Sequence, residues 1–204
     1  MTMIREPRIV PTPLDQLRPT QITVGLREVQ EKRVHWRTKR GKSKFLGNHL
    51  IPVIHGFKDR LYVIDHHHLA RALHDEGVEE VAIAVIADLR RLDRESFWNF
   101  MDARGWMHPY DEQGRRRSYR ELPRTVADLK DDPYRSLAGE LRHAGGFSKD
   151  TTPFSEFLWA DFLRRRIERR QVERRFNAAL RTALRLARSL EADYLPGWCG
   201  PVRR

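Results

Sequence analysis

The sequence contains almost no cysteine and no long apolar run, and both absences narrow the class of protein. Cys199 is the single cysteine among 204 residues, which excludes an internal disulfide and a cysteine metal cluster. No apolar run approaches the roughly 20 residues that a membrane helix needs. The first residues, 1–17, carry charges and prolines where a signal peptide needs an apolar core. We therefore expect a cytoplasmic protein that does not enter a membrane.

Several catalytic signatures are also missing. The phosphate-binding pattern GxxxxGK[ST] is absent, and so are the zinc-binding spacings HxxxH and HExxH. The chain is rich in charge, at 33%, and its mean hydropathy is -0.68, yet 40% of its residues are hydrophobic. This composition predicts a folded, soluble protein rather than a disordered one.

Acidic residues are too few to balance the basic ones. The chain has 39 Lys and Arg against 28 Asp and Glu, a net charge of +11, which favours an anionic partner. Residues 161–188 hold ten arginines and only three acidic residues. A solvated helix face is the commoner explanation of such a run, and nucleic acid is the functional alternative. The candidate nucleic-acid contacts are Arg164, Arg165, Arg169, Arg170 and Arg174.

The rest of the chain is organised around one stretch, residues 61–76, with the sequence LYVIDHHHLARALHDE. It begins with four apolar or aromatic residues, continues with Asp65 and three consecutive histidines, and ends in a helical pattern. A strand that runs into a helix places the first free N–H groups of the helix beside this polar cluster. Such a helix start is a ready site for an anion, usually a phosphate.

The first half of the chain reads as a small α/β unit. Thr20 is the expected N-cap of its first helix. A basic segment follows, which we expect to be a solvated loop or a phosphate-contacting lid. The predicted elements are a helix over residues 22–37, the basic loop over 39–44, strands over 51–54, 61–64 and 78–86, and a helix over 69–76. The strands at 51–54 and 61–64 are expected to form a hairpin.

The second half reads as helical. Asp93 is the expected cap of a helix, residues 111–124 form a polar loop, and Pro133 opens the next helix. A further helix is predicted over 154–170. The last helix carries an apolar stripe of Val172, Phe176, Leu180, Ala183, Ala187 and Leu190. This stripe could pack internally or against a second copy, so a homodimer stays open.

These motifs, in this order, resemble the ParB/sulfiredoxin superfamily, and most of all its ParB-like nuclease branch. The resemblance rests on GLREV, IPVI, YVID, the histidine turn and LARAL, and it covers roughly residues 8–90. The helical remainder, with DDPYRSLAGELR and PFSEFLWADFLRR, resembles the extension of that branch. The implied fold is α+β, with a small mixed sheet and helices over residues 1–92. An all-helical extension over residues 93–204 is expected to pack on it.

The turn departs from the family pattern at three positions. It commonly reads Gly-Glu-Arg-Arg in partition proteins, Gly-Cys-His-Arg in sulfiredoxins and Asp-Gly-His-His-Arg in ADP-dependent serine kinases. Here His66 replaces the glycine, His67 the sulfiredoxin cysteine and Leu69 the arginine. A sulfinic-acid reductase is therefore excluded, and one phosphate clamp is lost. The resemblance to the kinases also suggests Glu28, in GLREV, as a catalytic base.

The chemistry expected of the turn is phosphate handling. Two histidines at a helix N-terminus can hold phosphate oxygens and stabilise the charge of phosphoryl transfer. Alternatively, the histidines cap and pack the helix, or with Asp65 they bind Zn²⁺ or Mn²⁺, for which consecutive histidines are poor geometry. The candidate catalytic residues are His67, His68 and Glu28. The candidate phosphate-binding residues are Asp65, His66, Arg27 and Lys42, and Asp65 is also the candidate ligand for nucleotide-bound Mg²⁺.

Three functions compete on this evidence. The first is an Mg²⁺-dependent phosphotransferase or nucleotide hydrolase that acts through the histidine turn on a nucleotide or another phosphorylated ligand. The second is a nuclease whose arginine-rich helix holds the phosphate backbone. The third is a non-enzymatic DNA-binding or chromosome-partitioning module, which is weakened because no complete helix-turn-helix signature stands out. We favour the first, because the histidine pair lies at the start of a helix.

Overall fold

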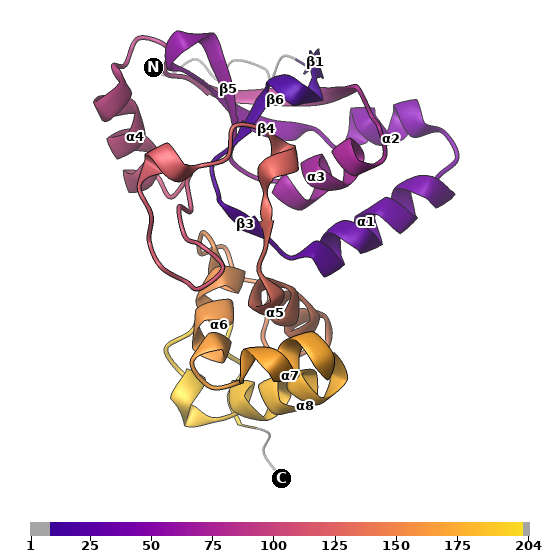
Figure 1. Ribbon diagram of the computed structural model, residues 1–204, viewed down its shortest axis with the longest axis vertical. Helices are drawn as coiled ribbons and strands as arrows, with labels where there is room; N and C mark the ends of the chain where they lie inside the picture. The colour runs from indigo at the N-terminus through magenta and orange to yellow at the C-terminus, as the bar shows by residue number, and fades with distance from the viewer. Residues whose placement is uncertain (1–8, 202–204) are drawn as a thin grey trace.

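The computed structural model describes residues 9–201, so the beginning of the predicted first domain, residues 1–8, lies outside the described residues. A curled mixed sheet with helices forms one end of the molecule, and four helices form the other (Figure 1). The predicted α+β class is confirmed. No helix in the described range is both long and apolar enough to cross a membrane.

The sheet has five strands in the order β1-β6-β4-β5-β2. Their bounds are β1 Ile9–Pro13, β2 Leu17–Pro19, β4 Ile51–Gly56, β5 Arg60–Val63 and β6 Glu80–Asp88. The predicted hairpin is confirmed, since β4 and β5 pair antiparallel. β1 lies at an edge, where Pro11 and Pro13 need not donate to a second neighbour.

Alternation along the strands gives the sheet two different faces. On β4, Val53 contributes to one hydrophobic core and its neighbour Ile54 to another. On β5, Val63 faces the first core and Tyr62 the second. Helices α1 Leu26–Thr38, α2 Lys42–Asn48 and α3 His67–Asp75 pack on the first face. Helix α4 Arg94–Ala103 packs on the second face.

Three predictions in this half need correction. Helix α1 begins after Gly25, and Thr20 is not its N-cap but a buried residue of the preceding segment. The basic segment is not a loop throughout, because α2 forms there and buries Phe45 in the core. Helix α3 begins at His67, two residues before the apolar pattern, because the polar histidines also belong to its first turn.

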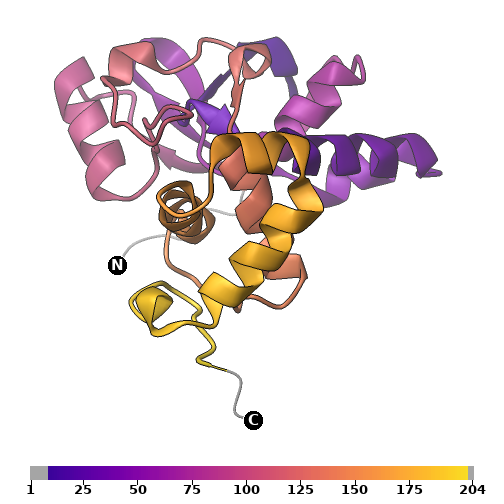
Figure 2. The same ribbon diagram turned by 60° about the horizontal axis from the view of Figure 1, so that its bottom comes forward.

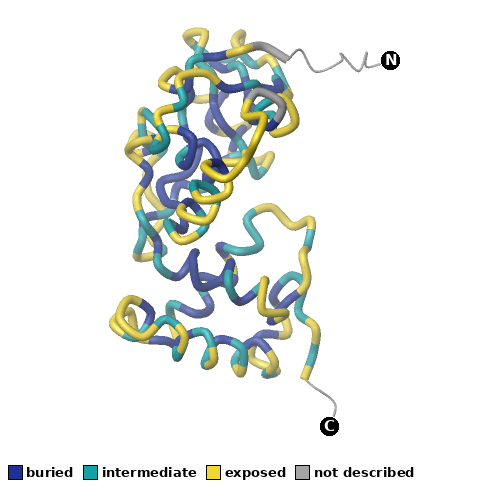
Figure 3. The backbone as a smooth tube through the Cα atoms, turned by 90° about the vertical axis from the view of Figure 1, so that its right-hand side faces the viewer, coloured by how far each residue is buried: buried dark blue, intermediate teal, exposed yellow. Residues whose placement is uncertain are grey.

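The helices of the other half share a separate core. They are α5 Pro133–His143, α6 Ser155–Arg164, α7 Arg169–Arg174 and α8 Phe176–Ala187. The predicted starts of α4 at Asp93 and of α5 at Asp132-Pro133 are confirmed, because both aspartates cap their helices. Figure 2 shows α8 crossing in front of α5. Figure 3 shows that both halves of the molecule contain buried residues.

The predicted helix over 154–170 and the single last helix are both wrong. Helix α6 ends at Arg164, and Arg175 leaves the helical conformation between α7 and α8. These breaks fold the apolar faces of three short helices onto one core, which one straight rod could not do. Most of the apolar stripe packs internally, since Val172, Ala183 and Ala187 are buried there, whereas Leu190 is 71% exposed.

Two strands join the halves. Strands β3 Thr23–Val24 and β7 Lys130–Asp131 form a short parallel ladder just before α1 and α5. The Leu26 N–H donates to an Asp131 carboxylate oxygen at 3.0 Å, and the Arg27 N–H to the Ser136 hydroxyl at 3.3 Å. Gly25 lies so close to Ser136 that a Cβ there would come within 2.8 Å of its Oγ. The starts of α1 and α5 are therefore fixed against each other.

Truncation of Phe97 tests the packing of α4 on the sheet. Phe97 is fully buried, whereas Phe100 on the same helix is 40% exposed. We expect Phe97→Ala to lower the free energy of unfolding by about 3–5 kcal/mol, because it leaves a cavity. The matched change Phe100→Ala should cost far less, and urea denaturation measures both. Equal losses would contradict the proposed core.

Candidate functional site

The histidine turn begins with a strained residue. His66 adopts the left-handed conformation with φ 63°, at the position where the family pattern has glycine. The Asp65 carboxylate stabilises this turn by accepting the His66 N–H at 2.6 Å. The His66 Nδ1 lies 3.0 Å from the Leu50 carbonyl oxygen, to which it donates. The Nε2 atom of this exposed ring has no partner within the described part of the chain.

His67 points inward and fastens the chain that precedes α1. Its side chain is buried, and its Nε2 accepts the Thr20 N–H at 3.2 Å. The Thr20 hydroxyl donates to the Val63 carbonyl oxygen at 2.6 Å. The lone pair of Nε2 is thus occupied by backbone, and the structure does not bring His67 to a ligand-accessible surface.

His68 also accepts a backbone N–H from the segment that precedes α1. Its Nε2 accepts the Gly25 N–H at 3.0 Å, immediately before α1 begins. The same nitrogen lies 3.5 Å from a carboxylate oxygen of Glu28. His68 therefore links the start of α3 to the start of α1, and one edge of its ring borders a pocket.

Both histidines are neutral because of their surroundings. Burial lowers the pKa of His67 to about 3, against a partial opposing effect of Asp65. Burial and the nearby Arg135 guanidinium lower the pKa of His68 well below its usual range. Neutral rings can accept a backbone N–H, which charged imidazolium rings cannot. These values fit the capping and packing role better than a role as phosphate-binding cations.

Four of the sequence-predicted site residues share one pocket of about 660 Å³ between α1, α3 and α5. They are Glu28, Asp65, His66 and His68. The other predicted phosphate ligands lie elsewhere: the Arg27 guanidinium stacks 3.6 Å from the ring centre of Phe176, and the Lys42 ammonium lies over Trp36.

Basic and acidic groups balance one another in this pocket. Arg135 is buried between Glu28 and Glu156, with which it forms ion pairs, and Arg142 also binds Glu156 at 2.6 Å. Lys32 pairs with Glu28 at 3.3 Å. The pocket therefore offers little net positive charge to a phosphate.

A group of potential metal ligands includes Glu31, which lines the same pocket. One ligand atom each of Glu31, Glu140 and His143 lies within 4.8 Å of the others. Glu31 comes from α1, and the other two residues come from neighbouring turns of α5. Partial burial and a hydrogen bond to Glu140 raise the pKa of Glu31. Two carboxylates and an imidazole are a donor set that suits Mn²⁺, Mg²⁺ or Zn²⁺.

This group contains residues that the sequence reasoning did not select. Glu140 and His143 have the spacing Glu-x-x-His, which puts both side chains on one face of a helix. That spacing was available in the sequence and could have been found. The third member, Glu31, is 109 positions before Glu140, so only the packing of α1 against α5 brings it near.

The candidate nucleic-acid arginines divide into two sets. Arg164 is bound by Asp132 at 2.6 Å, Arg165 by Asp161 at 2.8 Å and Arg169 by Glu173 at 2.7 Å. Among the described residues, Arg170 and Arg174 have no acidic partner. Exposed arginines without acidic partners within residues 9–201 continue along α7 and α8 and comprise Arg170, Arg174, Arg175, Arg181, Arg185 and Arg188. We call this set the α7–α8 arginine surface.

The chain is similar to a known family and to a protein of known structure. The family described as "Putative ParB-like nuclease" matches residues 10–165. The chain is also similar to protein Atu1540 from Agrobacterium tumefaciens, known from a crystal structure, with 54% sequence identity and a TM-score of 0.92. That alignment covers 97% of this chain and 99% of the other. None of the curated proteins matches this chain.

The buried histidines predict a specific dependence of stability on pH. Between about pH 6.5 and 3 the unfolded chain binds a proton at position 67 that the folded chain excludes. The free energy of unfolding should therefore fall as pH falls through this window, by up to about 1.4 kcal/mol per pH unit for each such histidine. In His67→Gln the side-chain oxygen can accept the Thr20 N–H without titrating. We expect a shallower slope in urea denaturation between pH 7.5 and 4.5.

The exposed His35 provides the control for this measurement. His35→Gln should leave the slope unchanged. His68 and His108, whose pKa values burial also lowers, preserve part of the slope in the His67 variant. A wild-type slope in His67→Gln would show that His67 is protonated in the folded protein.

Proposed function

The chain belongs to the ParB-like nuclease family, as its motifs predicted, and from this premise we propose that it binds DNA and cleaves the phosphodiester backbone in a metal-dependent reaction. The family supports a nuclease or DNA-binding role. The metal dependence and the residues that carry the reaction are our proposal.

One observation carries the proposal, namely the convergence of Glu31, Glu140 and His143. Glu31 also lines the pocket beside the histidine turn. A bound divalent ion would polarise a phosphate oxygen and lower the pKa of a coordinated water. The three side chains would hold that ion. The site is open to solvent on one side, since Glu31 and His143 are exposed, so a phosphate backbone can reach it.

The pocket supplies two further groups. His66 lines the pocket and its Nε2 has no partner among residues 9–201, so this nitrogen can accept a proton from water or donate one to a leaving oxygen. Lys149 lines the same pocket and has no acidic partner within the described residues, so its ammonium can contact a phosphate. Asp65 serves the turn, where it accepts the His66 N–H.

The arrangement favours the nuclease over the phosphotransferase that we favoured from sequence. The phosphotransferase depended on His67 and His68 as ligands of a phosphate, but both use Nε2 for backbone N–H groups. A nucleoside polyphosphate also needs a surplus of positive charge, and the arginines of this pocket are neutralised by Glu28 and Glu156.

The α7–α8 arginine surface supplies a means of binding DNA. Its six arginines are exposed, and each can pair with a backbone phosphate and release a counterion. This binding requires no base contacts, so we expect affinity for duplex DNA with little sequence preference.

Replacement of a metal ligand tests the nuclease. Glu31→Gln and Glu140→Gln retain the size of the side chain but remove a negative donor. We expect each to reduce plasmid nicking in Mn²⁺ or Mg²⁺ by at least about 10-fold, because metal sites lose this much even when an outer partner is changed. The exposed Glu95 on α4 gives the matched control Glu95→Gln, which should nick at the wild-type rate.

Two outcomes would contradict the proposal. Equal nicking by the wild type and Glu140→Gln would remove the metal group from the mechanism. Phosphate release from ATP or CTP by the wild type, with no nicking, would replace DNA by a nucleotide as the substrate.

Salt dependence tests the DNA surface independently of cleavage. Arg181→Ala removes an arginine without an acidic partner, and we expect it to reduce the slope of log affinity against log salt by about 1. Arg166→Ala is the control, because Arg166 is already bound by Glu191 at 2.9 Å. Fluorescence anisotropy with a labelled duplex in EDTA measures both. An unchanged slope of log affinity against log salt in Arg181→Ala would show that DNA binds at another surface.

A further inference from the structure

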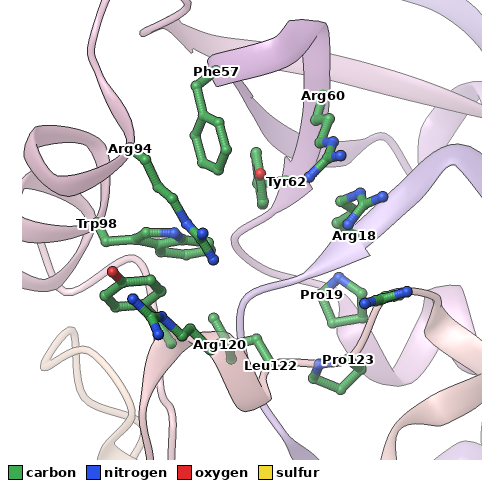
Figure 4. Close-up of a pocket in the computed structure, with 12 residues that line it drawn as sticks. Arg18, Pro19, Phe57, Arg60, Tyr62, Arg94, Trp98, Arg120, Leu122 and Pro123 are labelled. Carbon is green, nitrogen blue, oxygen red and sulfur yellow. The ribbon is translucent and has the colours of Figure 1, made fainter.

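A second pocket lies on the opposite face of the sheet, away from the histidine turn. Helix α4, the segment at residues 119–124 and the β2–β5 edge of the sheet enclose a cavity of about 300 Å³ (Figure 4). The register of the strands explains its composition. Arg18 on β2 is paired with Tyr62 on β5, so both side chains point to the face that carries α4. Arg60, two residues before Tyr62, shares that face.

Five arginines line this cavity, and no acidic side chain in the described residues does. They are Arg18, Arg60, Arg94, Arg120 and Arg124. Within residues 9–201 none of them forms an ion pair, whereas most arginines around the histidine pocket do. Burial, and then the nearby positive charges of Arg60 and Arg124, lower the pKa of Arg18, as expected where like charges lie close together. An anion would relieve this repulsion.

Aromatic rings form the remaining wall. Tyr62 and Trp98 are buried at its base, and Tyr119 stacks on Trp98 with ring centres 5.4 Å apart. Phe57 packs beside Tyr62 and Trp98, with its ring centre 5.9 and 6.3 Å from theirs. The Arg94 side chain reaches toward the middle of the cavity (Figure 4). Partly exposed rings beside guanidinium groups accept a planar base by stacking.

One buried donor in this wall has no partner. No group in the described residues accepts the indole N–H of Trp98, although Trp98 is only 6% exposed. Buried N–H groups are nearly always satisfied, so an isolated one beside a cavity points to an acceptor supplied by a ligand. This observation is independent of the charge of the arginines.

We propose that this cavity binds a phosphorylated nucleoside, with its phosphates among Arg18, Arg60 and Arg124 and its base against Phe57 and Tyr119. The volume suits a single nucleotide and excludes a duplex. The nucleotide can be free or can form the 5′-phosphorylated end of a single strand, since both present the same groups. The proposal does not depend on the metal site, which lies across the sheet.

Calorimetry in EDTA tests the proposal, because the absence of metal ions separates it from the nuclease reaction. We expect the wild type to bind ATP or a 5′-phosphorylated oligonucleotide, and Arg18→Ala and Arg60→Ala to weaken that binding at least 10-fold. Arg40→Ala removes the same charge from an exposed position outside the cavity and should leave affinity unchanged. Arg60→Lys, which retains the charge but not the planar fork, should fall between Arg60→Ala and the wild type.

Further probes separate the parts of the proposal. Inorganic triphosphate should bind more weakly than ATP, and equal affinity would overturn the role of the aromatic wall. Trp98→Phe keeps an aromatic ring but removes the N–H and part of the buried indole. We therefore expect a lower urea midpoint, and a few-fold loss of affinity measured on the folded protein. Binding by the oligonucleotide but not by ATP would identify a strand end as the source. Absence of binding by both probes, or equal affinity in Arg60→Ala and Arg40→Ala, would overturn the proposal.

Discussion

Two neutral imidazole rings at the start of α3 hold this structure together. His67 and His68 accept the N–H groups of Thr20 and Gly25, and so fix both ends of the segment that leads from the sheet into α1. The pairing of β3 with β7 and the contact of Gly25 with Ser136 then position α5 relative to this segment. The relative position of α1 and α5, and with it the candidate metal group, depends on uncharged histidines.

The two faces of the sheet carry different chemistry because strand side chains alternate. One face bears the histidine turn and a pocket in which acids and bases neutralise one another. The other bears a pocket whose arginines have no acidic partner in the described part of the chain. Within residues 9–201, arginines without an acidic partner gather in this second pocket and on the α7–α8 arginine surface. Both are suited to phosphate, and neither is the turn that dominates the sequence.

Much of the fold follows from local signals. The hairpin of β4 and β5 and the caps at Asp93 and Asp132 were predicted correctly, since alternation and capping act within a few residues. The failures occurred where tertiary packing overrides local preference. Nothing in the sequence between Arg164 and Arg175 breaks a helix, yet the chain turns twice there, because three apolar faces reach one core. Helix α2 forms in a basic segment because Phe45 finds a buried position.

The sequence by itself determined the family, the α+β class and the importance of the histidine turn, because these depend on motifs that are contiguous in the chain. It also predicted Glu28, Asp65, His66 and His68 as site residues, and the structure places these four residues in one pocket. Only the tertiary structure decided which way each ring points, since burial and hydrogen-bond partners come from distant segments. It alone joined Glu31 to Glu140 and His143, and arginines from position 18 to position 124 into one cavity. Such sites depend on how close helices and strands lie in space. The spacing of residues along the chain does not encode that distance.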